Sequence, residues 1–227
     1  VLVRRAWVLC ASVLISCTRS GEPDPPSQDG PIEPYDAWSL VDPFIGTGGE
    51  GAVVAGVSPG ASLPYGMTLV GPDTRHSSYG APGFYHFGGY HWGDDRIEGF
   101  SHTHSHGMGV NDYGAVHVMA RARWSPEYTD GAGRAAPFGL DREWAEPGYY
   151  SVDLLDDGIN VQIAATARGA HHRFTFEGST GVVVVDLGHT LGDATVDEAW
   201  ITISPQGEIR GFQRLSGAYS GRFDGLQ

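Results

Sequence analysis

The chain has 227 residues, a length that holds one sizeable domain together with an export segment. Its 27 acidic residues outnumber its 14 basic ones, and the formal net charge of −13 excludes the basic field that attracts nucleic acid, so no nucleic-acid partner is expected. The 34 glycines, the 14 prolines and the 11% of aromatic residues are typical of a turn-rich β-protein rather than a helical bundle.

The first seventeen residues have the pattern of an export signal. Two arginines precede an apolar run at residues 6–16, which is too short for a permanent membrane-spanning helix. Residues 14–17 (Leu-Ile-Ser-Cys) resemble a bacterial lipobox, which predicts lipidation of Cys17; an ordinary signal peptide is the alternative. We therefore expect residues 1–17 to be a lipoprotein signal peptide. The protein should be exported to the periplasm or the cell surface, with its lipid as the only membrane anchor.

Residues 18–37 are rich in Pro, Gly, Ser and Asp and predict a disordered linker, because such a segment buries too little apolar surface to fold. The only two cysteines, Cys10 and Cys17, precede this linker. The rest of the chain therefore has no disulfide and no thiolate ligand for a metal ion.

From residue 38 onward, short apolar segments alternate with Gly, Pro and Asp-Gly, and no long stretch keeps apolar residues at helical spacing. This pattern predicts one all-β domain over residues 38–227, incomplete at its carboxyl end. The clearest hairpin joins residues 149–155 to residues 159–166 through a turn at 156–158, where Asp-Gly favours the positive φ of a tight turn. Apolar and polar residues alternate in its second strand, so one face should meet a core.

Further strands are predicted at residues 172–176 and 182–187, and the second is interpreted as a central strand because it is apolar on both faces. Residues 200–204 and 208–213 predict another hairpin. Repeated antiparallel hairpins without intervening helices favour a two-layer antiparallel β-sandwich. Residues 41–114 differ, because they are dense in Gly, His and aromatics and lack regular alternation, which indicates a loop-rich surface that carries function.

Eight short segments stand out by their motifs. They are residues 41–49 (VDPFIGTGG), 59–67 (PGASLPYGM), 71–75 (GPDTR), 89–92 (GYHW), 97–104 (IEGFSHTH), 112–114 (DYG), 147–150 (PGYY) and 166–176. In this order they resemble motifs of the amino-terminal domain of glycoside hydrolase family 92, an α-mannosidase family. The resemblance covers roughly residue 40 to the end of the chain.

The resemblance implies a galactose-mutarotase-like β-sandwich that packs against a following (α/α)-barrel. Together these domains would form an exo-acting, inverting α-mannosidase that depends on calcium and acts on mannose-containing glycans. In the family, the catalytic acid and base and the calcium ligands lie in the barrel. No catalytic residue and no metal ligand is therefore assigned in this chain, which is expected to be a fragment that is not catalytic alone.

Trp92 and Tyr90 are the predicted sugar contacts. An aromatic face stacks on the C–H face of a pyranose, and Trp92 lies in the sequence beside polar residues suited to bind hydroxyl groups. In the family, an aromatic residue from this region reaches the substrate pocket. The structural alternative is a tryptophan that caps the core of the sandwich.

Asp73 and Arg75 are two further substrate-binding candidates. They are expected either to form an ion pair that orders their loop, which is the favoured interpretation, or to approach the rim of the pocket. Four other carboxylates have the chemistry of an acid–base pair but are interpreted as turn formers or solvated side chains. They are Asp94, Asp95, Glu98 and Asp112.

His102, His104 and His106 alternate along the chain, so on a strand their imidazoles would project from one face and present nitrogens to zinc. The resemblance instead implies that His102 and His104 belong to the family's SHTH segment, near the domain junction, where they are substrate-binding candidates. Two alternatives to the enzyme therefore stay open. One is a carbohydrate-binding lipoprotein that acts alone through Tyr90 and Trp92, and the other is a zinc-binding β-protein that uses the three histidines.

Overall fold

The computed structural model describes residues 37–49, 56–77, 86–107, 112–192 and 194–223. The predicted signal peptide, Cys17 and nearly all of the predicted linker lie outside these residues. The strands are β1 (Ala61–Ser62), β2 (Leu69–Arg75), β3 (Arg96–Ser101), β4 (His117–Arg121), β5 (Ala136–Glu146), β6 (Tyr149–Leu154), β7 (Ile159–Ala165), β8 (Ala170–Phe176), β9 (Val182–Asp186), β10 (Thr195–Ile203) and β11 (Ile209–Ser216). The short helices are η1 (Ala37–Leu40), η2 (Pro126–Thr129), α1 (Gly131–Arg134) and η3 (Ser220–Phe223). No helix in the described part of the chain is long and apolar enough to cross a membrane.

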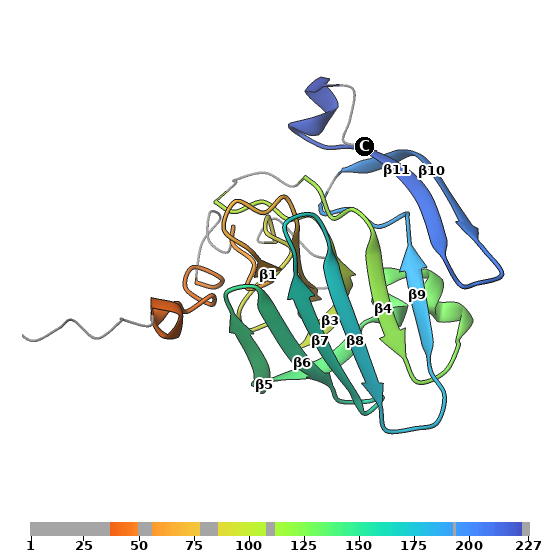
Figure 1. The fold of residues 1–227 in the computed structure, drawn as a ribbon, viewed down its shortest axis with the longest axis horizontal. Helices are drawn as coiled ribbons and strands as arrows, with labels where there is room; N and C mark the ends of the chain where they lie inside the picture. Colours follow the sequence, from red (N-terminus) through yellow and green to blue (C-terminus); the bar gives the residue numbers. More distant parts are fainter. Residues whose placement is uncertain (1–36, 50–55, 78–85, 108–111, 193, 224–227) are drawn as a thin grey trace, which may run out of the picture. The chain divides into compact units, whose positions relative to one another are not determined.

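The strands form an all-β sandwich of two antiparallel layers, as the sequence predicts. One layer is the meander β5–β6–β7–β8, and Figure 1 shows β3 of the other layer behind it. The second layer holds β1, β2, β3, β4 and β9. The two layers are continuous at one corner, where Arg96 and Ile97 of β3 pair with Pro137 and Ala136 of β5.

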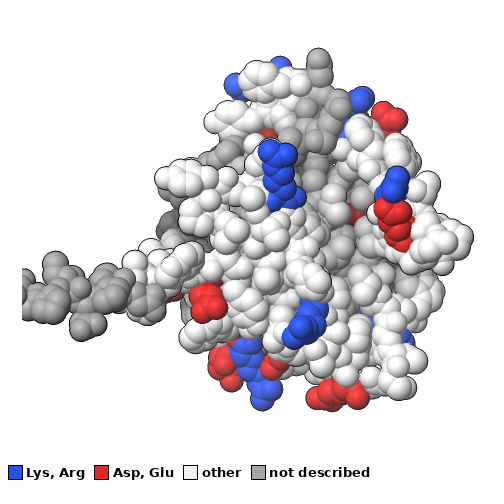
Figure 2. Space-filling model, in the orientation of Figure 1, with Lys and Arg blue, Asp and Glu red and all other residues white. Residues whose placement is uncertain are grey.

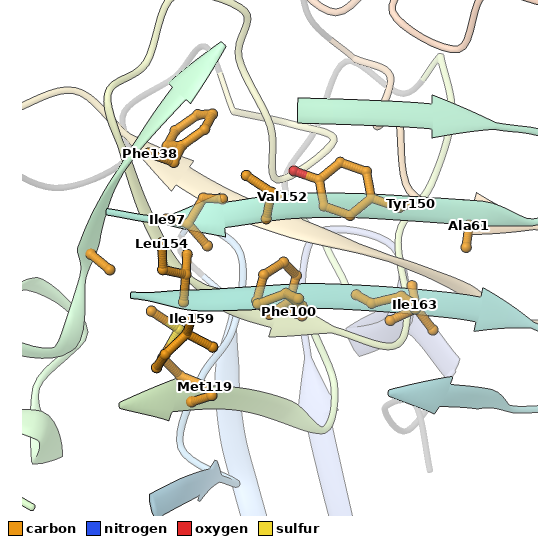
Figure 3. Packing of buried hydrophobic residues seen from close by; sticks show 14 residues of the cluster. Ala61, Ile97, Phe100, Met119, Phe138, Tyr150, Val152, Leu154, Ile159 and Ile163 are labelled. Atoms are coloured by element: carbon orange, nitrogen blue, oxygen red, sulfur yellow. The ribbon is translucent and has the colours of Figure 1, made fainter. Parts of the chain in front are cut away.

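The hydrophobic core lies between the layers (Figure 3). From one layer it takes Val70, Ile97, Phe100 and Met119, and from the other it takes Tyr150, Val152, Leu154, Ile159, Val161 and Ile163. All of these side chains are at most 1% exposed. Burying each such side chain contributes roughly 1.5–3 kcal/mol, so this interface is the main source of stability.

The predicted hairpin of β6 and β7 is confirmed. Val152 pairs with Val161 and Leu154 with Ile159, so alternate residues of both strands face the core. The turn between them contains Gly158, whose φ of +58° is one that residues with a side chain rarely adopt. Each of the two strands ends one residue earlier than predicted.

The predicted strand at residues 182–187 exists as β9, but its interpretation as a central strand is wrong. Within the described residues β9 pairs only with β4, and Val183 is 50% exposed. A run of valines indicates burial on both faces, yet β9 lies at an edge of its layer with its outer face open. The second predicted hairpin is confirmed as β10–β11, which is longer than expected and forms its own two-stranded sheet.

The region at residues 41–114 contains more regular structure than its sequence indicates. β1, β2 and β3 all lie within it, and β2 pairs along most of its length with β3. Five consecutive residues of β2, from Val70 to Thr74, are buried, so no alternation of polar and apolar residues marks it. On the face shown in Figure 2, acidic and basic side chains of the described residues are interspersed rather than gathered into a patch of one sign.

Candidate functional site

Asp73, near the end of β2, is the centre of a buried polar cluster. Its Oδ1 lies 2.8 Å from Nε2 of His104, and its Oδ2 lies 2.8 Å from Nε2 of His189. His104 follows β3 and His189 follows β9, so one carboxylate joins three segments of the sandwich. His117 at the start of β4 completes the cluster, because its ring stacks on that of His189 at a centroid separation of 4.0 Å.

Two glycines make room for these side chains. A Cβ atom on Gly89 would lie 2.4 Å from Oδ1 of Asp73, and one on Gly99 would lie 2.2 Å from the His117 ring. Both glycines also have positive φ values, of +82° and +154°. Any larger residue at either position would displace the cluster.

Burial and charge set the protonation of the cluster. Burial raises the pKa of Asp73, but the charges of His104 and His189 and their hydrogen bonds outweigh this effect and hold that pKa well below its usual range. Burial lowers the pKa of His189, but the Asp73 carboxylate beside it outweighs burial and raises that pKa. Burial, reinforced by His189, lowers the pKa of His117 well below its usual value. Asp73 is therefore ionised and His117 neutral near pH 7.

A pocket of about 390 Å³ opens beside the cluster. Its lining includes Asp73, Arg75, Glu98, Arg134, Asp186 and His189. Burial raises the pKa of Glu98, although its ion pair with Arg75 opposes that shift. The pocket is thus polar and joins carboxylates, guanidinium groups and an imidazole.

Trp92 lies on the surface and is 43% exposed. Its backbone N–H donates a 2.8 Å hydrogen bond to the carbonyl oxygen of Thr47, and its ring forms a T-shaped contact with the Phe44 ring at a centroid distance of 5.3 Å. The fold thus brings together two motifs, residues 41–49 and 89–92, that are far apart in the sequence. These contacts fix the indole while leaving part of it open to a ligand.

Tyr90 does not suit its predicted role as a second sugar platform. Its side chain is fully buried, and its hydroxyl donates a 2.9 Å hydrogen bond to Glu143. Burial, reinforced by the charge of Glu143, raises the pKa of Tyr90 well above its usual value. Its ring has no open face on which a pyranose could stack in this conformation.

The three alternating histidines do not converge, because β3 ends at Ser101 and they follow it in a loop. Nε2 of His102 lies 3.0 Å from Nε2 of His172, whereas His104 contacts Asp73 and His106 is exposed beside a different pocket. Burial lowers the pKa of His102, although its hydrogen bond with the Val116 carbonyl opposes that shift. The zinc site built from these three residues is therefore not supported.

The expected ion pair between Asp73 and Arg75 is also wrong, because Arg75 pairs with Glu98 and Asp73 with histidines. The remaining carboxylates have structural partners. Asp94 accepts a hydrogen bond from Thr74 and contacts His86, Asp95 accepts two hydrogen bonds from Ser77, and Asp112 accepts the backbone N–H groups of Tyr113, Tyr219 and Ser220. These contacts favour structural roles, but Asp94, Glu98 and Asp112 are at most 4% exposed, so their interpretation as solvated side chains is wrong.

Sequence reasoning missed His117 and His189. His117 opens a buried strand, and His189 lies 116 positions from Asp73, its hydrogen-bond partner. Neither lies in a recognisable ligand spacing. The one local signal is Gly99, a glycine inside a strand, which often marks the close approach of another group.

Comparison with known proteins identifies the family. The profile of the glycosyl hydrolase family 92 N-terminal domain matches residues 40–225. A family GH92 α-mannosidase from Bacteroides thetaiotaomicron is 28% identical, with a TM-score of 0.67 over 79% of this chain and 24% of that one. A family GH92 inverting mannosidase from Bacteroides thetaiotaomicron VPI-5482 is 27% identical, with a TM-score of 0.59 over 75% of this chain and 21% of that one.

An uncharacterized secreted glycosidase from Arthroderma benhamiae is 28% identical over an alignment of 169 residues, and the match covers 67% of this chain and 20% of the relative. The chain thus spans less than a quarter of the length of each of these relatives. Because the family profile covers most of the chain and the sandwich agrees with the solved structures, this protein belongs to glycoside hydrolase family 92 and carries its N-terminal domain.

Proposed function

We propose that this domain forms one wall of the sugar pocket of an exported, exo-acting, inverting α-mannosidase, and that Trp92 contacts the sugar. The family membership supports a glycoside hydrolase. Two relatives are mannosidases, and the α-mannosidase is also known in complex with mannoimidazole. The Arthroderma relative is a secreted glycosidase, which supports export of the whole protein.

The observation that carries the proposal is the exposed but fixed indole of Trp92. Phe44 and the backbone of Thr47 hold it in place, so a ligand that stacks on it meets a preorganised surface and orders little on binding. Trp92 provides the apolar face that the C–H groups of a pyranose require.

The catalytic acid, the catalytic base and the calcium ligands belong to a further domain in this proposal. The two-stranded sheet β10–β11 offers a surface for that domain, because Ile201, Ile203 and Ile209 share one face and are each at least 41% exposed. Val183 of β9 is exposed to the same extent. Exposed apolar side chains that lie together mark interaction surfaces, and a packed catalytic domain would remove them from water.

The decisive experiment measures kcat/KM of the full-length enzyme on 4-nitrophenyl α-mannoside. Trp92→Ala should lower kcat/KM about tenfold, which is the loss of ~1.4 kcal/mol of transition-state binding. Trp92→Phe should retain part of the activity because it keeps an aromatic face. Trp144→Ala, at an indole that is 60% exposed on β5, is the matched control and should leave kcat/KM unchanged.

An equal kcat/KM for Trp92→Ala and wild type would contradict the role of Trp92. Absence of any mannosidase activity in the full-length wild type would contradict the proposal as a whole. Proton NMR of the first sugar released tests the stereochemistry, because an inverting enzyme releases the β-anomer from an α-mannoside. Binding to mannose-rich glycans by the 227-residue chain alone would favour the carbohydrate-binding lipoprotein instead.

The lipid anchor is a separate part of the proposal. Labelling with a fatty-acid analogue in a bacterial host should modify the wild-type chain and leave Cys17→Ala unlabelled. Equal labelling of the two would refute lipidation at Cys17, and export by an ordinary signal peptide would remain.

A further inference from the structure

The cluster around Asp73 has the geometry of an open metal site. One ligand atom each from Asp73, His117 and His189 lies within 4.8 Å of the other two. Oδ2 of Asp73 lies 2.8 Å from Nε2 of His189 and 3.9 Å from Nε2 of His117. Zinc binds imidazole nitrogen and carboxylate oxygen at about 2.0–2.2 Å, so one ion between these atoms meets all three with small side-chain rotations.

His117 supplies an independent observation. Its side chain is 0% exposed, and neither Nδ1 nor Nε2 has a hydrogen-bond partner among the residues that the structure describes. Leaving a buried polar atom unpaired costs roughly 1–3 kcal/mol, so such an atom needs an explanation. Nε2 lies beside the ionised Asp73 carboxylate, and Gly99 leaves the room that the His117 ring occupies. A cation between the carboxylate and the imidazole would satisfy both groups.

We propose that Asp73, His117 and His189 bind one divalent transition-metal ion of the zinc class. Two imidazole nitrogens and one carboxylate oxygen suit zinc, whereas calcium takes six to eight oxygen ligands. The fourth position opens to the pocket of about 390 Å³ that Asp73 and His189 line, where water would complete the tetrahedron.

The surroundings support such a site. Oδ1 of Asp73 is held by Nε2 of His104, so the ion would bind Oδ2 and replace the proton that Oδ2 shares with Nε2 of His189, which would be released to water. An outer hydrogen bond of this kind orients a metal-binding carboxylate and is typical of natural sites. The three ligands come from β2, from β4 and from the segment after β9, so the ion would cross-link the sheet to that segment. Metal binding should therefore stabilise the folded domain.

The test uses the full 227-residue chain without a polyhistidine tag, stripped with a chelator. Titration calorimetry with ZnCl2 should show one ion per chain with a low-micromolar or lower Kd, and zinc should raise Tm by several degrees. CaCl2 should do neither. If no heat is released at zinc concentrations up to about 100 μM, the proposal is overturned.

Variants decide which residues bind the ion. His189→Gln keeps a donor to Asp73 but loses the ligand nitrogen, so it should fold and lose at least tenfold in zinc affinity. His117→Ala should lose as much, with circular dichroism of the metal-free chain confirming the fold. His171→Gln, at an exposed position on β8, is the matched control and should bind as wild type does.

The His102–His172 pair is the competing location, because its two Nε2 atoms lie 3.0 Å apart. The double variant His102→Gln/His172→Gln should keep the wild-type affinity. Loss of binding in this variant, together with wild-type affinity in His189→Gln, would overturn the assignment. Since the readouts are affinity and Tm, a failure here is distinguishable from a failure of the mannosidase proposal.

Discussion

Glu143 predicts an unusual dependence of stability on pH. This carboxyl group of β5 lies between two tyrosines, and accepts hydrogen bonds from Tyr90 at 2.9 Å and from Tyr150 at 2.6 Å. Burial raises its pKa from 4.5 to about 7, even though the hydrogen bonds from the two tyrosines act in the opposite direction. The folded protein therefore favours the protonated, neutral form of Glu143.

The sign and the size of the effect follow from that pKa. The stabilising contribution of the neutral form is complete below pH 4.5, the unfolded value, and is lost as the pH rises through about 7. The difference between these two values corresponds to about 3 kcal/mol, at 1.36 kcal/mol for each pH unit. Glu143→Gln resembles the neutral form, since its amide both accepts from one tyrosine hydroxyl and donates to the other. At pH 8 this variant should be more stable than wild type by up to that amount, and at pH 4 nearly equal to it.

Urea unfolding of the chain at pH 4, 6 and 8, followed by tryptophan fluorescence, measures the difference. Glu146→Gln removes an exposed carboxylate from the same strand, and its free energy of unfolding should follow the pH as that of wild type does. The reasoning is refuted if Glu143→Gln is less stable than wild type at pH 8, or if the two proteins show the same difference in stability at every pH.

Three further substitutions test the packing, each by the free energy of unfolding in urea. Arg134→Leu should cost about 3 kcal/mol, because the buried guanidinium pairs with Asp186 at 2.6 Å and its loss removes the positive charge that neutralises that carboxylate. Asp112→Ala should cost about 1–3 kcal/mol, since it leaves the backbone N–H of Tyr219 and its neighbour without an acceptor. Leu154→Ala, at a fully buried position, should cost about 2–5 kcal/mol by opening a cavity.

The part of the fold that could be predicted from sequence is the part where each strand has one buried and one open face. Alternation marks β7, where Ile159, Val161 and Ile163 face the core, and Asp-Gly marks the turn before it. β2 could not be found in this way because consecutive residues are buried on both of its faces. The prediction that β9 is a central strand is wrong for the opposite reason, since its valines are apolar and yet Val183 is open to solvent.

The sequence motifs also predict the candidate site only in part. The motifs identify Trp92 and Tyr90 as equals, but one indole is exposed and the other ring is covered by the sandwich. Exposure depends on what packs over a side chain, and the residues that decide it, Phe44 and Glu143, lie far away in the sequence. A motif can therefore indicate that a segment matters without showing which of its side chains meets the ligand.

The histidine cluster shows why the spacing of histidines in the sequence predicts a metal site less well than the room that the fold leaves around them. His102, His104 and His106 have a suitable spacing only on a strand, and the chain leaves β3 before it reaches them. Gly99, inside that strand, carries the more useful signal, because its missing Cβ leaves the volume that the His117 ring occupies. A strand tolerates the conformational cost of an internal glycine where another group must approach closely. If the His117 ring needs that space, Gly99→Ala should lower zinc affinity as well as stability, whereas a purely structural glycine would affect stability alone.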